Sequence, residues 1–370
     1  MNKVIRILYY GLDTHLGGIE TYLLSVVKNL GTEKYSFSFL SFDDKKPYFY
    51  EELTKLGCSF YFIRSRRKSF LGNKRDLFNL FKREHFDIVH CNLNSLTYIT
   101  PILIALRFGI KVIAHSHNAG SSYGSSSKLL CAINKLRFPY NKVSLVAVSD
   151  KAGIWMFGKK RSVVTINNGV NTQHFRFSFD KRKKCREDLG LSDGQEILLH
   201  VGAFRKQKNH SFILDIFKAY KVKNVNSVLL LVGDGELQDN IQKKASDLGV
   251  SNDVFFLGTR HDLDSVFSAS DKFIFPSLYE GFPIALLEAE CSGLLCVVSN
   301  EITEQACLNN SIRVGLNEPI CNWIDALESK TLANRTMFSN YVADCGFDIK
   351  NETLKLKNLY DKLCENKHGR

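Results

Sequence analysis

Short apolar runs alternate with stretches of helical periodicity along almost the whole chain, and this alternation limits the possible folds more than any other feature. The runs predict strands at 4–10, 36–42, 59–63, 88–90 and 111–115 in the first half, and at 197–201, 227–232, 254–257, 272–275 and 295–299 in the second. Consecutive strands are separated by enough chain for a helix, and helical crossovers connect parallel strands. We therefore predict an α/β protein with two parallel sheets.

The same pattern predicts two domains, which also suits a length of 370 residues. We expect an N-terminal Rossmann-like domain at 1–175, a linker at 176–194 and a C-terminal Rossmann-like domain at 195–348. The linker is predicted from the basic run 181–184 and from a low apolar content. The last stretch, 349–370, carries a helical apolar stripe that must pack on another element. Because parallel sheets bind ligands at the carboxyl ends of their strands, we expect the two domains to face a cleft with one substrate on each side.

The positive charge is distributed unevenly. Residues 1–170 contain 25 Lys and Arg and 11 Asp and Glu, whereas residues 171–370 contain 25 and 27, so the balances of +14 and −2 make up the net charge of +12. A basic half is typical of proteins that bind nucleic acid, an anionic membrane surface or a phosphorylated substrate. Composition does not choose among these three.

Cysteine usage and apolar runs indicate the cellular compartment. The ten cysteines include no Cys-x-x-Cys pair and no zinc-ligand spacing with His, so we expect reduced thiols. We expect no signal peptide, because the apolar run that begins at Val4 is short and no cleavage site follows it. The longest later apolar run, 99–106, is far below the roughly 20 residues of a membrane span. These features predict a cytoplasmic protein.

The most informative motif is the segment from Phe275 to Glu288. A strand is predicted to end at Phe275, a loop containing Glu280 follows, and a helix begins near Ile284 and carries Glu288. Carboxylates accept hydrogen bonds from sugar hydroxyls, and the free N–H groups of a helix N-terminus bind phosphate. The segment therefore suits a ligand that has both groups.

With its seven-residue spacing, this pair of glutamates resembles the Glu-x7-Glu signature of retaining glycosyltransferases. The order of motifs along nearly the full chain resembles glycosyltransferase family 4, above all the enzymes that build bacterial capsule, exopolysaccharide or O-antigen units. The resemblance implies a GT-B fold, with the C-terminal helix packing back on the N-terminal domain. It also implies that Glu288 bonds the ribose of a nucleotide sugar and that Glu280 holds hydroxyls of the transferred sugar. The backbone of Gly281, Phe282 and Ile284 would touch the sugar and phosphate.

Two further motifs are expected to contact the donor diphosphate. Gly17 and Gly18 follow the first strand and open a helix, and glycines there permit close approach of the backbone. In the second domain the family pattern places Lys208 at the pyrophosphate. The same pattern expects an arginine where this chain has Ala203, and Arg205 is our candidate to supply the missing guanidinium.

Two more segments belong to the predicted site. The family often has a histidine after the strand at 111–115, and we choose His117 over His115, although strand alternation turns both to the same side. Thr259 and Arg260 follow a strand where the family receives the nucleobase. The predicted catalytic residues are Glu280, His117 and Lys208.

Asp262 and Asp264 form the Asp-x-Asp sequence that metal-dependent glycosyltransferases use. Asp262 stands where the next helix needs a cap, and Lys208 with helix N-termini can stabilise the leaving diphosphate. We therefore expect neither a metal ion nor another cofactor.

The resemblance implies a retaining glycosyltransferase that moves a sugar, preferably from a UDP-sugar, to a lipid-linked saccharide acceptor. The expected location is the inner face of the cell membrane, with anionic lipid bound by the basic N-terminal domain. Phe70, Leu71, Phe78 and Phe81 lie among basic residues and are candidates for the interface, unless they belong to the core. A sugar-nucleotide 2-epimerase is the alternative enzyme. A nucleic-acid-binding protein is the alternative class, but no nucleic-acid-binding motif supports it, so we expect no nucleic-acid partner.

Overall fold

The computed structural model describes residues 4–15, 17–120, 124–329 and 334–365. The chain forms two compact units: Met1–Asn168 together with Ile349–Arg370, and Gly169–Asp348. Residues 1–3 of the predicted N-terminal domain and residues 366–370 of the predicted C-terminal segment lie outside the described residues. Each unit is built on its own parallel sheet, which confirms the predicted α/β fold.

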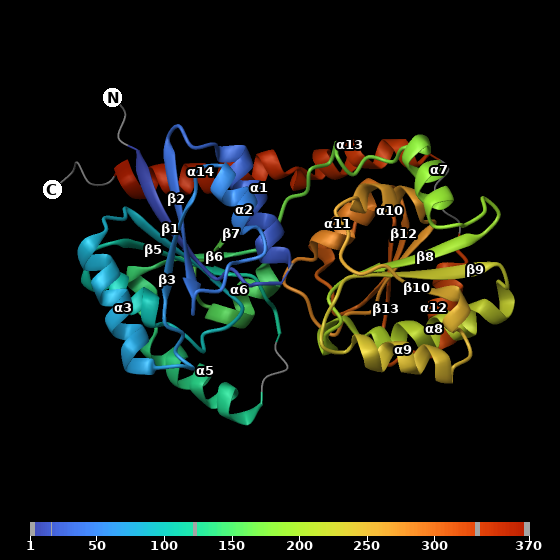
Figure 1. The fold of residues 1–370 in the computed structure, drawn as a ribbon, viewed down its shortest axis with the longest axis horizontal. Coiled ribbons are helices and arrows are strands. Elements are labelled where there is room, and N and C mark those ends of the chain that lie inside the picture. Colours follow the sequence, from blue (N-terminus) through green and yellow to red (C-terminus); the bar gives the residue numbers. More distant parts are fainter. Residues whose placement is uncertain (1–3, 16, 121–123, 330–333, 366–370) are drawn as a thin grey trace. The chain divides into compact units, whose positions relative to one another are not determined.

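The first unit has a seven-stranded sheet with the order β3-β2-β1-β4-β5-β6-β7 (Figure 1). Strand order reverses between β1 and β4, which pair in parallel, and such a switch point is where parallel sheets bind ligands. The strands are β1 (Ile5–Tyr10), β2 (Tyr35–Phe42), β3 (Ser59–Ile63), β4 (Ile88–Leu93), β5 (Lys111–Ser116), β6 (Ser144–Ala147) and β7 (Val164–Thr165). The helices are α1 (Gly18–Leu30), α2 (Tyr50–Lys55), α3 (Phe70–Arg83), α4 (Thr100–Arg107), α5 (Ser125–Arg137), α6 (Asp150–Phe157) and α14 (Ile349–Glu365).

The second unit has a six-stranded sheet with the order β10-β9-β8-β11-β12-β13, so its switch point lies between β8 and β11. The strands are β8 (Glu196–Val201), β9 (Ser227–Val232), β10 (Val254–Phe256), β11 (Lys272–Phe275), β12 (Leu295–Ser299) and β13 (Ser311–Val314). The helices are α7 (Phe179–Asp188), α8 (His210–Lys223), α9 (Gln238–Asp247), α10 (Leu263–Ala269), α11 (Ile284–Cys291), α12 (Ile320–Leu327) and α13 (Phe338–Val342).

Apolar side chains from strands and helices form a separate core in each unit. In the first unit Leu8 and Val89 of the sheet pack with Ile102 of α4, and all three are fully buried. In the second unit Leu198 of the sheet packs with Trp323 of α12 in the same way. Two cores of this kind are what two independent layers of helix on sheet require.

The C-terminal helix belongs to the first unit. Figure 1 shows α14 beside α1, and the two helices are in contact. Tyr360 of α14 is fully buried and its hydroxyl lies 2.7 Å from that of Tyr9 in β1. The final helix is therefore part of the core of the unit that begins the chain.

The predicted linker at 176–194 lies inside the second unit, and most of it forms α7, which packs on α10. Arg182 and Arg186 of α7 each donate to one carboxylate oxygen of Asp271, at 2.7 Å in both cases. Arg186 is only 1% exposed. The basic run looks like a linker in sequence because its acidic partner lies about 85 residues away.

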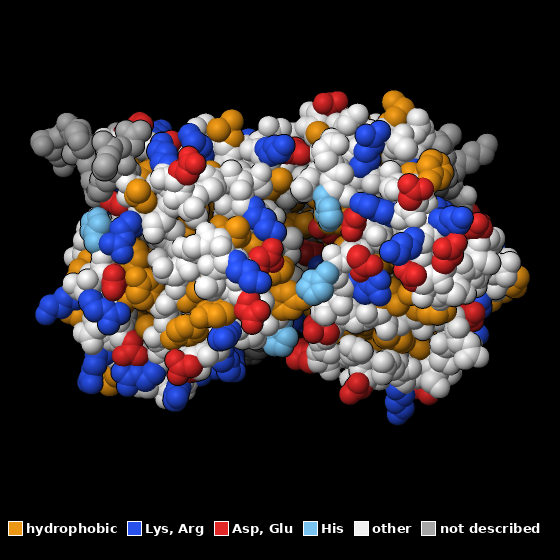
Figure 2. All heavy atoms as spheres, turned by 45° about the horizontal axis from the view of Figure 1, so that its top comes forward, with side chains coloured by type: hydrophobic (Ala, Val, Ile, Leu, Met, Phe, Trp, Pro, Cys, Tyr) orange, Lys and Arg blue, Asp and Glu red, His pale blue; other side chains and the backbone are white. Residues whose placement is uncertain are grey.

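The distribution of charge on the surface is relevant to the predicted binding of a membrane. On the face drawn in Figure 2, basic and acidic side chains are interspersed over both units. No helix among the residues that the structure describes is long and apolar enough to cross a membrane.

Candidate active site

The loops after β8 and β11 meet at the switch point of the second sheet. The two strands are parallel neighbours, with Lys272 opposite Leu198, so both loops leave the same edge. Backbone and side-chain bonds join the loops: Leu278 N donates to Gln207 O at 2.9 Å, and Asn209 Nδ2 donates to Pro276 O at 3.2 Å. This edge is where an open parallel sheet presents a ligand site.

Lys208 and Glu280, predicted from separate motifs, form an ion pair across these loops. Lys208 Nζ lies 2.7 Å from Glu280 Oε1 and 4.7 Å from the centre of the Phe275 ring. Gln207 Nε2 donates to the other carboxylate oxygen, at 3.1 Å. Both side chains of the ion pair are mostly buried, with 19% of Lys208 and 9% of Glu280 exposed. The carboxylate is thus fixed in orientation, and the ammonium group is held at the sheet edge.

Glu288 lies on α11, two turns after the loop that holds Glu280. Its side chain is 5% exposed, and burial raises its pKa from 4.5 to about 8. The carboxyl group therefore carries a proton at neutral pH. Gly281, Phe282 and Ile284 connect the two glutamates and are themselves buried. A buried acid of this kind is suited to hydrogen bonding with the hydroxyl groups of a ligand.

Arg205 differs from Lys208 in its surroundings. Phe204 is fully buried, with its ring stacked 4.2 Å from that of His210, whereas Arg205 and Lys206 are exposed and Ala203 is half-buried. The Arg205 side chain therefore extends from a loop that Phe204 anchors to the core. Whether it replaces the arginine expected at position 203 stays a prediction.

Sequence reasoning passed over Gly233 in the loop after β9. It adopts a φ of 137°, and a Cβ there would lie 2.3 Å from the carbonyl oxygen of Gly202. Phe204 N also donates to Asp234 O at 2.8 Å. The loop that precedes Lys208 is therefore positioned by backbone contacts with the loop after β9. The Gly-Asp-Gly sequence directly after a strand was the available signal.

Thr259 and Arg260 follow β10 at the same end of the sheet. The Arg260 guanidinium makes two hydrogen bonds to Asp262, of 2.8 and 2.6 Å, and these bonds lower the pKa of that carboxyl group. Asp264 lies 2.5 Å from Lys181 Nζ. Both aspartates of the Asp-x-Asp sequence thus form ion pairs with basic side chains.

In the first unit, Gly17 and Gly18 stand at the start of α1, with Gly17 as the N-cap. A carboxylate already lies there: Glu20 Oε1 accepts a hydrogen bond from Asp13 N at 2.8 Å, and Glu20 Oε2 is 2.8 Å from where a Cβ of Gly17 would stand. A phosphate at this helix end would meet that negative charge. The predicted diphosphate contact at Gly17 and Gly18 therefore needs the Glu20 carboxylate to move or to be protonated.

His117 follows β5 and is 9% exposed. Its Nε2 lies 2.9 Å from Asn92 Oδ1, and its ring centre is 4.1 Å from that of His115, which confirms that both rings turn to one side. Burial lowers the pKa of His117 to about 3, so the imidazole is neutral at physiological pH. Its Nδ1 has no hydrogen-bond partner within the described part of the chain.

Comparisons with known proteins agree with this architecture. A family model described as "Glycosyltransferase Family 4" matches residues 16–174, and one described as "Glycosyl transferases group 1" matches residues 181–311. EpsF of Bacillus subtilis (strain 168), whose name assigns it provisionally to the glycosyltransferases, is 28% identical over 99% of this chain and 98% of its own length. An Escherichia coli UDP-Gal:alpha-D-GlcNAc-diphosphoundecaprenol alpha-1,3-galactosyltransferase is 27% identical over 79% of each chain.

Solved structures show the same fold. Anabaena Alr3699/HepE, crystallised with UDP and glucose, superposes with a TM-score of 0.80 at 18% identity, over 97% of this chain and 100% of its own. A sucrose-phosphate synthase from Thermosynechococcus elongatus gives a TM-score of 0.77 at 17% identity. Two Rossmann-like units, each able to bind a ligand at the switch point of its sheet, define the GT-B class of enzymes. The chain belongs to the glycosyltransferases that combine a family 4 N-terminal part with a group 1 C-terminal part.

Proposed function

We propose that the protein transfers a sugar, with retention at the anomeric carbon, from a UDP-sugar to a lipid-linked saccharide in the synthesis of a bacterial surface polysaccharide. The observation that carries the donor assignment is the Lys208–Glu280 ion pair at the β8/β11 switch point, with Glu288 buried on the helix that follows. This arrangement places a cation, which can bind a diphosphate, beside carboxyl groups, which can bind the hydroxyls of sugar and ribose.

In this proposal each part of the donor has its own partner. Lys208 stabilises the negative charge that develops on the diphosphate as the sugar leaves, with Arg205 and the start of α1 at Gly17 and Gly18 as further contributors. Glu280 orients hydroxyls of the transferred sugar, and Gln207 keeps its carboxylate in place. Because Lys208 is paired with Glu280, its ammonium group would have to contact both the Glu280 carboxylate and a donor phosphate when the donor binds.

The remaining contacts follow from the positions of the side chains. Glu288 would bond the ribose hydroxyls, and Thr259 and Arg260 would lie near the base. Gly281, Phe282 and Ile284 would contribute backbone groups. His117, neutral because of its burial, would serve as a hydrogen-bonding group near the sugar and acceptor and not as a cation. The proposal needs no metal ion, since the cations and helix ends supply the required positive charge.

The acceptor assignment draws on relatives. The Escherichia coli relative acts by name on a diphosphoundecaprenol-linked sugar, and a Campylobacter jejuni relative, 29% identical over 29% of this chain, acts on a diphospho-undecaprenol-linked one. Another relative is CapH of Staphylococcus aureus, a capsular polysaccharide biosynthesis glycosyltransferase. These names support a lipid-linked acceptor and a role in surface polysaccharide synthesis.

A lipid-linked acceptor implies that the enzyme acts at a membrane surface. Three of the four apolar candidates for the membrane interface are exposed. Phe70 and Leu71 of α3 are 58% and 75% exposed, and Phe78 is 46% exposed. Phe81 is 4% exposed and packs in the core, so for this residue the alternative of a core position holds. We propose peripheral attachment to the inner face of the cell membrane through the basic first unit.

Product analysis tests the proposal. Purified protein is incubated with a panel of nucleotide sugars and a lipid-linked saccharide extract, and products are analysed by mass and by the anomeric NMR coupling. One sugar added to the acceptor with retained configuration supports the proposal. An epimerised nucleotide sugar with an unchanged acceptor would identify an epimerase instead.

A pair of lysine variants tests the site. Lys208→Gln is expected to lower transfer by about 100-fold or more, because it removes the cation at the leaving diphosphate. Lys206→Gln, with the same change on an exposed neighbour in the same short helix, is the control and should retain wild-type turnover. Equal turnover of the two variants would reject Lys208 as a catalytic residue.

A further inference from the structure

Helix α5 has its apolar side chains on the outside of the first unit. Leu129, Ile133 and Leu136 follow a helical spacing and are 65%, 43% and 90% exposed. Asn134 is the one residue of α5 that is buried, and its Nδ2 donates to Leu96 O at 2.7 Å. A helix that serves the core has the opposite pattern. The exposed face of α5 therefore needs an apolar environment from outside this unit.

The chain around this helix has a strong positive charge. Residues 125–163 contain eight Lys and Arg and a single acidic residue, Asp150, so the segment contributes 8 − 1 = +7 of the +14 of residues 1–170. Those basic residues are Lys128, Lys135, Arg137, Lys142, Lys151, Lys159, Lys160 and Arg161. An apolar stripe among this many cations is typical of a surface that binds anionic lipid.

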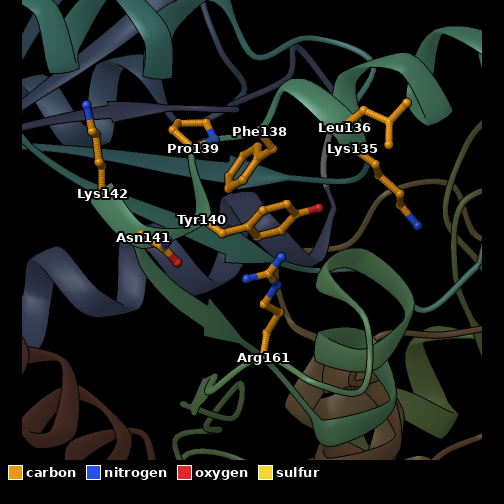
Figure 3. A pocket seen from close by; sticks show the side chains of 8 residues that line it. All are labelled: Lys135, Leu136, Phe138, Pro139, Tyr140, Asn141, Lys142 and Arg161. Carbon is orange, nitrogen blue, oxygen red and sulfur yellow. The ribbon is translucent and has the colours of Figure 1, made fainter.

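A pocket lies where α5 ends. It has a volume of about 420 Å³, and the residues that line it include three basic side chains and no acidic one. The Tyr140 ring lies between Phe138 and the guanidinium of Arg161 (Figure 3), with the Arg161 Cζ 4.2 Å from the ring centre. The remaining lining residues are Lys135, Leu136, Pro139, Asn141 and Lys142.

The stacking in this pocket suits an anion that carries several oxygens. A guanidinium that rests on an aromatic face is held in one orientation and keeps its edge N–H groups available, which is the geometry that binds phosphate. Because Leu136 both lines the pocket and belongs to the exposed face of α5, the anion site and the apolar surface are continuous. A phosphate at the boundary of an apolar layer is the arrangement of a phospholipid.

Helix α5 is anchored to the same short stretch of chain as the segment that leads into α3. Arg66, just before α3, donates to Thr97 O at 2.5 Å, and Asn134 of α5 donates to the adjacent Leu96 O. Both bonds end on the segment between β4 and α4, which fixes the position of α5 on the first unit.

We propose that the pocket at Tyr140 and Arg161 binds the phosphate headgroup of an anionic phospholipid while Leu129, Ile133 and Leu136 of α5 enter the acyl region. The inference deepens the proposed function, on which its biological use rests, by assigning the membrane contact to a defined pocket and helix. Phosphate is the chemistry recognised, and a membrane lipid is its source.

Vesicle binding of the full chain tests this inference. Wild type is expected to co-sediment with vesicles of 30% phosphatidylglycerol in phosphatidylcholine and only weakly with pure phosphatidylcholine. The double variant Lys142→Gln/Arg161→Gln should bind the anionic vesicles about tenfold more weakly or worse, as loss of two cations near a lipid surface predicts. Lys183→Gln/Lys184→Gln makes the same charge change on exposed residues of α7 in the second unit and should bind like wild type.

The apolar part has its own readout. The chain has two tryptophans, Trp155 in the first unit and Trp323 in the second, and Trp323 is fully buried. Lys135 Nζ donates to Trp155 O at 3.0 Å, so Trp155 reports on the neighbourhood of the pocket. Brominated lipid should quench Trp155 in wild type, and Leu129→Ser/Leu136→Ser should reduce that quenching. The control Val222→Ser/Val225→Ser alters residues of similar exposure in the second unit and should not change it.

Several results would overturn the inference. They are equal binding to the two vesicle types, anionic binding unaffected by Lys142→Gln/Arg161→Gln, or quenching unaffected by Leu129→Ser/Leu136→Ser. Tight binding of inorganic phosphate without vesicle binding would assign the pocket to free phosphate, and preferential binding of a DNA oligonucleotide would assign the basic segment to nucleic acid. Transfer to a detergent-solubilised acceptor is measured in parallel. It should be unchanged in all these variants, so failure of transfer and failure of membrane binding are separable.

Discussion

The hydroxyl of Tyr360, on the C-terminal helix, lies 2.7 Å from Nδ1 of His90 in β4. The hydroxyl of Tyr9 lies at the same distance from that of Tyr360, and His90 Nε2 lies 3.1 Å from His115 Nδ1. A fully buried chain of polar side chains thus connects α14 with β1, β4 and β5, and it ends beside His117. Because burial makes such networks costly when incomplete, the last helix is a required part of the first unit.

Replacing Tyr360 with Phe tests this network. The variant leaves Tyr9 and His90 without one partner each in a buried environment, so the free energy of unfolding of the first unit should fall by about 1–3 kcal/mol. Urea titration followed by circular dichroism measures the change. The double variant Tyr9→Phe/Tyr360→Phe removes two of the polar groups together and should lose less than the sum of the two single variants. Additive losses would show that the hydroxyls are not coupled.

Burial of Glu288 gives a pH-dependent prediction. Its pKa is raised from 4.5 to about 8, so between these values the folded protein holds a proton that the unfolded chain releases. Stability from this group is therefore present below about pH 4.5 and is lost as pH rises through 8. Relative to Glu288→Gln, the wild type should lose stability between pH 6 and 9, by a few kcal/mol at most. Thermal unfolding of both proteins across this range measures the difference.

The same pair of proteins tests the role of Glu288 in donor binding. If the carboxylate accepts hydrogen bonds from ribose, UDP should bind wild type more tightly as pH rises toward 8, whereas Glu288→Gln should bind weakly and with little pH dependence. Calorimetric titration at pH 6, 7 and 8 gives both slopes. Parallel slopes in the two proteins would remove Glu288 from the nucleotide site.

The sequence predicted most of the sheets, because buried parallel strands are continuous apolar runs that can be recognised locally. It did not predict the contact between Lys208 and Glu280. Those residues belong to different motifs, and their distance depends on β8 and β11 being neighbours, which no local pattern encodes. The alternation of β5 did predict that His115 and His117 share a side, because that relationship is local.

Two elements were missed for opposite reasons. The basic segment at 181–184 was predicted to belong to a linker because Asp271, which binds Arg182 and the nearby Arg186, is distant in sequence. Helix α5 was not predicted because its apolar positions do not face a core, so its place depends on the single buried Asn134 and on the surroundings of the helix. Apolar patterns in a sequence indicate which residues are buried in a core. They predict poorly a helix held by a distant ion pair, such as α7, or one whose apolar side chains are exposed, such as α5.

Substitution of Gly233 by Ala should disrupt the loop before Lys208. The new Cβ would stand 2.3 Å from Gly202 O, and a φ of 137° is strained for any residue with a side chain. Donor binding should therefore be lost along with stability. Gly249→Ala is the matched control: its φ of 69° is also positive but no atom lies within 4 Å of the added Cβ, so it should cost only about 1 kcal/mol. Similar donor affinity in the two variants would argue against loop positioning by Gly233.

Buried histidines predict that the first unit is the more sensitive to acid. His90, His115 and His117 have pKa values lowered by burial, to about 3 for His90 and His117, so they bind protons only when the unit unfolds. Their stabilising contribution is present above pH 6.5 and is lost as pH falls below it, at up to about 4 kcal/mol per pH unit. In the second unit, the lowered pKa values of His200 and His210 act in the same direction.

In the first unit the raised pKa of Glu352 opposes three histidines, whereas in the second unit two buried acids oppose two histidines. Glu288 and Glu290 have pKa values raised to about 8 and about 7, and unfolding releases their protons over the range in which His200 and His210 take protons up. Lowering the pH from 7 to 5 should therefore reduce the melting temperature of the first unit more than that of the second. Single-tryptophan variants resolve the two transitions, because Trp323→Phe leaves Trp155 as the reporter of the first unit and Trp155→Phe leaves Trp323 as the reporter of the second. Equal shifts of both transitions would contradict the assignment of acid sensitivity to the histidine cluster.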